Sequence, residues 1–253
     1  MIRIAGLKKR FGNKMVLDGV DLSIERGETR VVIGRSGEGK SVLLKHVIGL
    51  LRPDAGDLQV NGITLNWRKK ETLARVREII GMLFQGAALF DSLNVHDNVA
   101  FALIEQGRMS EAEIDRVVEE KLDLVNLRGV GRLMPAELSG GMKKRVGLAR
   151  ALATDPAVML YDEPTTGLDP INADAINKMI RDMQRKLGVT TIVVTHDMTS
   201  AYNVGDRLSM LHQGQIIETG TPDEIRATSN PAVRQFILGL AEGPITAEAL
   251  AAS

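Results

Sequence analysis

The stretch Gly34-Arg35-Ser36-Gly37-Glu38-Gly39-Lys40-Ser41 decides the fold of this chain. It follows the apolar run 31–33 and precedes the segment 42–51, whose residues favour a helix. A strand, a glycine loop and a helix in this order form a phosphate-binding loop, because the glycines let successive main-chain N–H groups point at an anion. Lys40 would then contact the β- and γ-phosphates, and the Ser41 hydroxyl would complete a Mg²⁺ shell. The alternative is a glycine-rich turn that matches this pattern by chance, but such a turn has no reason to lie between a strand and a helix.

The bulk composition excludes several classes of protein. The 253 residues suit one large domain, and 32 basic against 32 acidic residues predict no nucleic-acid partner. The chain has no cysteine, which excludes disulfide bonds and thiolate metal sites. No apolar run approaches the roughly 18 residues that a membrane-spanning helix needs, and the N-terminus lacks a signal-peptide pattern. We therefore expect a soluble intracellular protein that reaches a membrane only through a partner.

Two adjacent carboxylates, Asp162 and Glu163, end the apolar run 157–161. Neighbouring residues on a strand point to opposite faces, so the two side chains can do different work. Asp162 can hold Mg²⁺ through water, and Glu163 can orient an attacking water and accept its proton. The alternative is a pair of exposed acids in a turn, which a buried strand disfavours.

Two further polar residues follow predicted strands. Gln85 comes after the apolar run 79–84, and His196 comes after the run 190–195. Because ligands gather at the carboxyl ends of parallel strands, we expect His196 beside the γ-phosphate. Gln85 has a position of the same kind, although many strands simply end in a solvated Gln, which is the alternative there. The remaining histidines are predicted to be structural or solvated: His46, His96 and His212.

A second anion site is predicted at Ser139-Gly140-Gly141, which precedes the helical pattern 143–152. Main-chain N–H groups and the helix dipole favour an anion there, although an ordinary N-cap serine with flexible glycines is the alternative. This site lies roughly 100 residues along the chain from the phosphate-binding loop, and one nucleotide does not explain both.

The rest of the chain divides into recognisable segments. Residues 2–7 and 16–24 alternate apolar and polar residues, as half-buried antiparallel strands do. Residues 87–134, in which a capping box at Ser110 opens a helix, are predicted to form an inserted and mainly helical lobe. A hairpin and one helix from Pro222 to about Gly239 are expected to close the core.

Phe11 lies in a basic and glycine-containing context, Lys9-Arg10-Phe11-Gly12. Its ring can stack on an adenine face. Burial in the core is the alternative, since phenylalanine is generally an interior residue.

In order and spacing, these features resemble those of the ATP-binding cassette transporter ATPases, over essentially the whole chain. The residues that carry the resemblance are Phe11, the phosphate-binding loop, Gln85, 138–142 (Leu-Ser-Gly-Gly-Met), Asp162-Glu163, Asp169 and His196. The resemblance implies an α/β fold: a P-loop NTPase core with a central mainly parallel sheet, an N-terminal antiparallel β-subdomain and an inserted helical subdomain. It implies a nucleotide-binding domain over 1–241, a tail over 242–253, and ATP and Mg²⁺ as cofactors.

The resemblance also implies a role for each site residue. It makes Phe11 the residue that stacks on adenine, and Gln85 the sensor of Mg²⁺ and of a transmembrane partner. It makes Glu163 the catalytic base and His196 the switch residue, acting with Lys40 on the phosphates. The implied activity is hydrolysis of ATP to ADP and phosphate, coupled to transport.

A head-to-tail homodimer is implied as well, and it explains the two anion sites. Each ATP would lie between the phosphate-binding loop of one subunit and Ser139, Gly140 and Gly141 of the other, while Asp169 lies in a loop that crosses the interface. Met142 departs from the family's usual Gln. Because the site works through main-chain N–H groups and Ser139, we expect it to remain functional.

The segment 86–101, Met142 and the residues 233–236 and 243–244 are similar to those of the ATPases of Mce-type, lipid-asymmetry phospholipid transporters. This resemblance implies a peripheral protein on the cytoplasmic side of a Gram-negative inner membrane. Its implied partners are permease subunits that contact residues 85–101 and an Mce-type substrate-binding protein. An importer of polar amino acids or metal ions is the alternative within transport.

Other classes of ATPase and GTPase fit less well. The dipeptide Asn177-Lys178 is followed by Ile180 where a guanine-reading motif needs an acid. Chromosome and DNA-repair ATPases insert long coiled coils, whereas residues 86–137 are too short and lack sustained heptads. A translation-factor ATPase would carry two cassettes in one chain.

Overall fold

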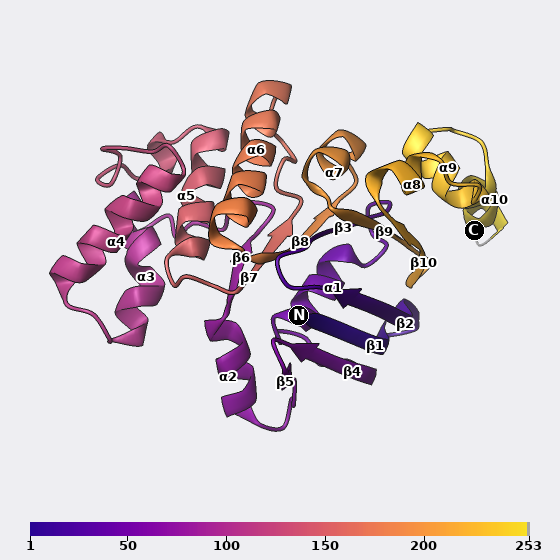
Figure 1. The fold of residues 1–253 in the computed structure, drawn as a ribbon, viewed down its shortest axis with the longest axis horizontal. Helices are drawn as coiled ribbons and strands as arrows, with labels where there is room; N and C mark the ends of the chain where they lie inside the picture. Colours follow the sequence, from indigo (N-terminus) through magenta and orange to yellow (C-terminus); the bar gives the residue numbers. More distant parts are fainter. Residues whose placement is uncertain (252–253) are drawn as a thin grey trace.

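The computed structural model describes residues 1–251, and for 248–251 only the main chain. The chain forms a six-stranded sheet, in the order β10-β9-β3-β8-β7-β6, and a four-stranded sheet, in the order β2-β1-β4-β5 (Figure 1). The strands are β1 Ile2–Phe11, β2 Lys14–Ile24, β3 Thr29–Ile33, β4 Ala55–Val60, β5 Ile63–Thr64, β6 Ile80–Leu83, β7 Val158–Asp162, β8 Thr190–Thr195, β9 Arg207–His212 and β10 Gln215–Gly220.

Helices cover both faces of the larger sheet. In Figure 1, α6 and α7 lie above it, and α1 lies below it beside the smaller sheet. None of the helices in the described residues is both long and apolar enough to span a membrane. The helices are α1 Lys40–Val47, α2 Lys70–Glu78, α3 Val95–Gln106, α4 Glu111–Leu124, α5 Gly140–Leu152, α6 Pro170–Leu187, α7 Met198–Val204, α8 Pro222–Arg226, α9 Pro231–Leu238 and α10 Pro244–Ala251, with a 3₁₀ turn at Pro135–Glu137.

The central strands of the larger sheet are parallel and fully buried. β3 pairs with β8 and β9, and β7 pairs with β6 and β8, all in parallel. Alternate residues of β3 enter different cores: Val31 and Ile33 join the cluster below α5–α7, and Val32 joins the cluster that contains α1 and the smaller sheet. Continuous apolar runs are therefore needed here, since both faces of the sheet are covered.

The predicted N-terminal antiparallel strands are confirmed. β1 pairs with β2 from Ile2↔Ile24 onward, and β1 pairs with β4 from Ile2↔Val60 onward, both antiparallel. Inward-facing residues such as Ile2, Ile4 and Leu22 are buried, which follows from their period-two pattern.

The predicted helical lobe, 87–134, contains α3 and α4, and α5, which begins beyond those bounds, packs against both and completes the lobe. Glu113 accepts hydrogen bonds from the main-chain N–H and the hydroxyl of Ser110, so the predicted capping box is present. Apolar residues of α3–α5 belong to the same buried cluster as Leu83 of β6 and Tyr161 of β7. The lobe and the upper face of the sheet therefore share one core.

The C-terminal region differs from the prediction of a single helix. The chain forms α8 and α9 instead, because Asn230 caps a new helix by accepting from the N–H groups of Ala232 and Val233. Residues of the predicted tail form α10, which Gln235 ties to α9 through hydrogen bonds with Ile245 and Thr246. Two further short helices, α2 and α7, were not predicted from the sequence.

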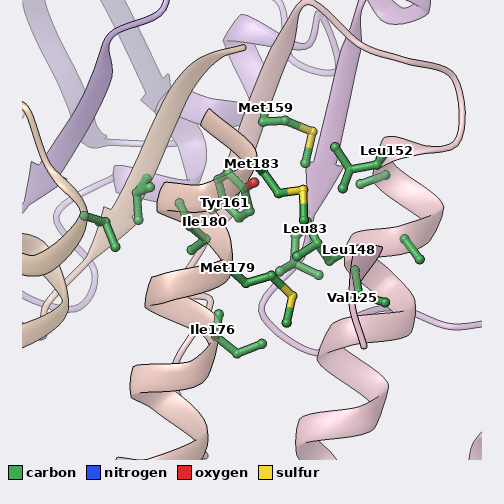
Figure 2. Close-up of a cluster of buried hydrophobic side chains, with 14 of the residues drawn as sticks. Leu83, Val125, Leu148, Leu152, Met159, Tyr161, Ile176, Met179, Ile180 and Met183 are labelled. Atoms are coloured by element: carbon green, nitrogen blue, oxygen red, sulfur yellow. The ribbon is translucent and has the colours of Figure 1, made fainter. Parts of the chain in front are cut away.

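Tyr161 places a phenolic hydroxyl inside the apolar core. The side chain is fully buried, and Figure 2 shows it between β7 and α6, close to Ile180 and Met183. Its hydroxyl finds no hydrogen-bond partner among the described residues. Burial raises the pKa of Tyr161, so the hydroxyl is neutral and keeps its full desolvation cost.

Tyr161→Phe should therefore stabilise the protein. Removing an unsatisfied buried hydroxyl should raise the free energy of unfolding by about 1 kcal/mol, measured by denaturant unfolding without nucleotide. Tyr202→Phe is the matched control, because that half-buried ring stacks against the Arg226 guanidinium carbon at 4.1 Å. A loss of stability in Tyr161→Phe would show that the hydroxyl has a partner in solution.

Candidate functional site

The predicted phosphate-binding loop joins β3 to α1. Gly39 has a φ of 98°, and a Cβ atom there would lie 2.9 Å from Val16 Cγ1. A Cβ atom on Gly34 would lie 2.4 Å from the carbonyl oxygen of Leu211. Both positions therefore require glycine, and the loop packs tightly against β2 and β9. Beside it lies a pocket of about 500 Å³, bordered by Val16, Arg35, Ser36, Gly37, Glu38 and His212.

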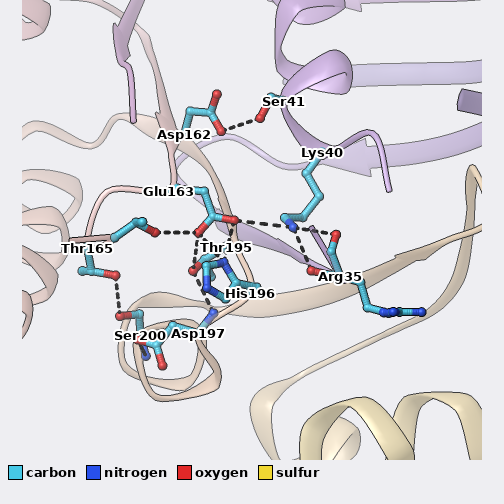
Figure 3. A network of polar contacts seen from close by, with 12 residues as sticks. Arg35, Lys40, Ser41, Asp162, Glu163, Thr165, Thr195, His196, Asp197 and Ser200 are labelled. Atoms are coloured by element: carbon cyan, nitrogen blue, oxygen red, sulfur yellow. Dashed lines mark hydrogen bonds and ion pairs between the residues drawn. The ribbon is translucent and has the colours of Figure 1, made fainter. Parts of the chain in front are cut away.

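Lys40 is buried at the start of α1. Its Nζ donates to the main-chain carbonyls of Gly34 at 2.7 Å and Arg35 at 3.0 Å, and lies 3.5 Å from Glu163 Oε1. Burial lowers the pKa of Lys40, and the nearby Glu163 and Asp162 carboxylates oppose this shift. Figure 3 shows the ammonium between the loop and Glu163. The lysine thus stands where the loop's N–H groups and the acidic strand meet.

Ser41 and Asp162 lie together although they are distant in sequence. The Ser41 hydroxyl donates to Asp162 Oδ1 at 2.8 Å. Burial raises the pKa of Asp162, and the Ser41 hydrogen bond opposes that shift. A hydroxyl and a carboxylate oxygen are hard donors of the kind that Mg²⁺ prefers, usually with substrate phosphates completing the shell. This pair therefore fits the predicted magnesium site.

Glu163 is buried and held in an unusual backbone conformation. Its φ of 49° lies in the left-handed region, and its N–H donates to the carbonyl of Val194 at 2.9 Å. The carboxylate accepts from Thr195 Oγ1 at 3.3 Å and from Thr166 Oγ1 at 3.2 Å, and it lies 3.0 Å from His196 Nδ1. Non-glycine residues adopt this conformation at a cost, and such strain clusters at functional sites.

The structure therefore brings five of the predicted residues into one cluster: Lys40, Ser41, Asp162, Glu163 and His196 (Figure 3). His196 is exposed on one side of this cluster and contacts Glu163 on the other. A cation, a hydroxyl–carboxylate pair and a carboxylate–imidazole pair meet at one sheet edge. Such a group can bind a phosphorylated ligand and move a proton.

Gln85 and Phe11 take other positions. The Gln85 side chain is exposed, and its main-chain carbonyl accepts a hydrogen bond from Lys144 Nζ. Phe11 ends β1 with 46% of its surface exposed and with Lys9 Nζ 5.4 Å from its ring centroid. The core alternative for Phe11 is therefore wrong, and an exposed ring is what stacking on a base requires.

The second predicted anion site lies in the helical lobe. Ser139 caps α5 by accepting from the N–H of Met142 at 3.3 Å, and Ser139 and Gly140 are exposed. Gly141 is buried against Asn172, and Asp169 caps α6 with its carboxylate bound to the same Asn172. That hydrogen bond lowers the pKa of Asp169. These residues form a second group, at the starts of α5 and α6.

Several contacts of the site were not predicted. Thr195 and Thr166 hold the Glu163 carboxylate, Glu38 accepts from the N–H of Gln213 at 2.7 Å beside His212, and Lys144 reaches the strand ends from α5. No sequence signal separates Lys144 from its basic neighbours Lys143 and Arg145. A helix that shows three basic residues in a row is ordinarily interpreted as a solvated surface.

Comparisons with known proteins agree with this geometry. Residues 17–166 match the ABC transporter family. The chain is 42% identical to the probable ribonucleotide transport ATP-binding protein mkl of Mycobacterium leprae, over 96% of this chain and 70% of that protein. It is 38% identical to the intermembrane phospholipid transport system ATP-binding protein MlaF of Escherichia coli K12, over 92% of this chain and 87% of that protein.

A solved structure extends the agreement to the fold. The dimeric, post-hydrolysis structure of the ATP-binding cassette MJ0796 bound to ADP and Pi is 31% identical, with a TM-score of 0.81 over 88% of this chain and 99% of that chain. The predicted P-loop NTPase fold is thereby confirmed. The chain belongs to the ABC transporter family, as an ATPase whose hydrolysis of ATP is coupled to transport.

Proposed function

We propose that this ATPase works as a head-to-tail homodimer that powers phospholipid transport from the cytoplasmic side of an inner membrane. The observation that carries the proposal is the convergence of Lys40, the Ser41–Asp162 pair and the Glu163–His196 pair at the carboxyl ends of β3, β7 and β8. Permease subunits and an Mce-type substrate-binding protein are its proposed partners.

The phosphate-binding loop holds the triphosphate. Its main-chain N–H groups and the start of α1 favour the anion, and the Lys40 ammonium moves from the loop carbonyls to the β- and γ-phosphates. Ser41 would bind Mg²⁺ and Asp162 would hold it through water, and Gln85, which follows the neighbouring strand β6, would be a further ligand. When bound, the cation neutralises charge that develops on the phosphates. Phe11 supplies a face for the adenine.

Glu163 is the general base. Its carboxylate is oriented by Thr195, Thr166 and His196, so it can hold a water in line with the γ-phosphate and take its proton. His196 is exposed on its other side, where it can donate to the γ-phosphate. The two residues therefore couple the presence of that phosphate to the position of the base.

The second half of each ATP site comes from a second copy of the chain. Ser139 and Gly140 are exposed at the start of α5, where N–H groups and the helix dipole favour an anion. Asp169 and Ile171, which is 82% exposed, lie on the surface at the start of α6 beside them. A cassette with 31% identity forms a dimer in its solved structure, which supports the same assembly here.

A groove of about 650 Å³ on the lobe side of β6 is the proposed contact for a permease helix. Phe90 and Phe101, which are 43% and 39% exposed, pack against each other in it, with ring centroids 4.7 Å apart and ring planes tilted by 39°. Leu89 and Leu93 of the same segment are half-buried, and Leu89 packs against the main core. Phe90 is therefore the apolar residue that the 87–95 segment offers to a partner.

The substrate class rests on the relatives. The name of the Escherichia coli relative specifies phospholipid transport, and the chain covers 87% of that protein. The mycobacterial relative is named for ribonucleotide transport, which makes a ribonucleotide the second candidate substrate. The comparisons do not favour the importer of polar amino acids or metal ions. Phospholipid is preferred because the match extends over most of both chains.

Glu163→Gln should retain ATP binding and lose most hydrolysis. General-base contributions are roughly 10²–10⁴-fold, and the amide cannot accept the proton. A stable ATP-bound dimer should accumulate on gel filtration, because hydrolysis no longer separates the subunits. Turnover close to that of the unmodified enzyme would exclude Glu163 as the base.

Ser139→Arg and Lys40→Ala test the composite site. Each variant alone should be inactive, since every site of its homodimer lacks one half. A mixture should recover activity in heterodimers, which contain one intact loop opposite one intact Ser139, with roughly half the sites of each heterodimer restored. Full activity of Ser139→Arg alone would contradict the head-to-tail arrangement.

Phe90→Asp should detach the ATPase from its permease while nucleotide binding persists. A carboxylate in an apolar groove disfavours docking of a helix. Ile104→Asp is the control, because Ile104 is 54% exposed on α3, the helix that contributes Phe101 to the groove, yet does not itself border the groove. Co-purification measures attachment, and phospholipid content of the outer membrane measures transport. If the variant had a normal outer-membrane phospholipid content but a defect in ribonucleotide uptake, the transported substrate would be a ribonucleotide and not a phospholipid.

A further inference from the structure

Lys144 is a buried cation that the proposed mechanism leaves without a role. It lies one turn into α5, and its side chain is 5% exposed. Its Nζ donates to the main-chain carbonyl of Gln85, and it lies 3.4 Å from the main-chain carbonyl of Glu163. One ammonium group therefore joins the helix that begins at Ser139 to the ends of two neighbouring strands.

The partners of Lys144 are unusual for a buried lysine. Burial lowers its pKa, and the nearby carboxylates of Asp162 and Glu163 oppose the shift. Its hydrogen bonds go to carbonyl oxygens, however, so the ammonium binds the backbone of the site and leaves both carboxylates to their own partners. Lys121, which is equally buried in the same lobe, pairs directly with the carboxylates of Glu120 and Asp155.

The two carbonyls belong to residues whose main chain matters for the reaction. Gln85 follows β6, and Glu163 has the left-handed φ of 49° that directs its carboxylate toward Thr195 and His196. A peptide held in a strained conformation persists only when its surroundings fix it. A cation at its carbonyl oxygen is such a constraint, because charge-assisted hydrogen bonds are stronger than neutral ones.

We propose that Lys144 is a positioning residue for hydrolysis. It fixes the backbone of Glu163, and through it the carboxylate, and it ties this backbone to Gln85 and to α5. The proposal rests on the proposed role of Glu163 as the base. A shift of the α5 start or of the Gln85 segment then moves the base directly, without passing through the nucleotide.

The test uses Lys144→Met, which keeps the length of the side chain and removes its charge and donors. Because misplacing a catalytic group by about 1 Å can cost 10²-fold, kcat should fall about tenfold to a hundredfold. The KM for ATP should stay within about threefold, since Lys40 and the loop are untouched. Lys144→Arg should recover part of kcat, because a guanidinium still donates to carbonyls.

Lys121→Met is the matched control, because it removes an equally buried ammonium from the same lobe. It should lower the melting temperature about as much as Lys144→Met while leaving kcat within about threefold. Equal losses of kcat in the two variants would show that Lys144 has only a structural role. A parallel loss of ATP affinity in Lys144→Met would likewise overturn the proposal. Should Lys144→Met not fold, Lys144→Gln, which keeps one amide donor group, is measured instead.

A double variant separates this proposal from the one on which it rests. In a Glu163→Gln background, Lys144→Met should lower the residual single-turnover rate by less than about twofold, because residues that act through one group are non-additive. A further loss of tenfold or more would mean that Lys144 acts elsewhere. Activity of Glu163→Gln itself would instead refute the base assignment, whatever Lys144 does.

Discussion

The parallel pairing of β3, β8 and β7 is the constraint on which the site depends. Its register sets Ile33 opposite Thr195 and Asp162 opposite Val194, so the three strands end within a residue of one another. Everything that follows these ends shares one sheet edge: the glycine loop after β3, Glu163 after β7 and His196 after β8. A slip of one residue in either pairing would turn the side chains to the opposite face and separate Ser41 from Asp162.

The sequence was informative wherever one residue type has one physical use. Close packing of the loop requires glycine at Gly34 and Gly39, so the cluster around Lys40 could be predicted. A sheet covered on both faces requires continuous apolar runs, so the core could be predicted too. The capping box at Ser110 was predictable for the same reason, since its two hydrogen bonds are local.

Prediction failed where a residue's environment is set by distant parts of the chain. Lys144 resembles its solvated neighbours in sequence, and only the packing of α5 against β6 and β7 buries it. Leu89 stands in a loop by sequence but reaches the shared core. The break between α8 and α9 is a different case, because its signal is local: Asn230 caps α9 and Pro231 occupies its first turn.

The shared core of the lobe and the sheet has a consequence for how such proteins diversify. Residues of α3, α4 and α5 pack in the same cluster as Leu83, Tyr161 and Met179, which belong to β6, β7 and α6. The lobe, which we propose faces a permease, is therefore not an interchangeable module. Grafting it from a relative would create cavities or overpacking beneath it, unless the upper face of the sheet were exchanged too. Substitutions that change the shape of the lobe therefore require compensating substitutions in the β6, β7 and α6 residues that pack against it.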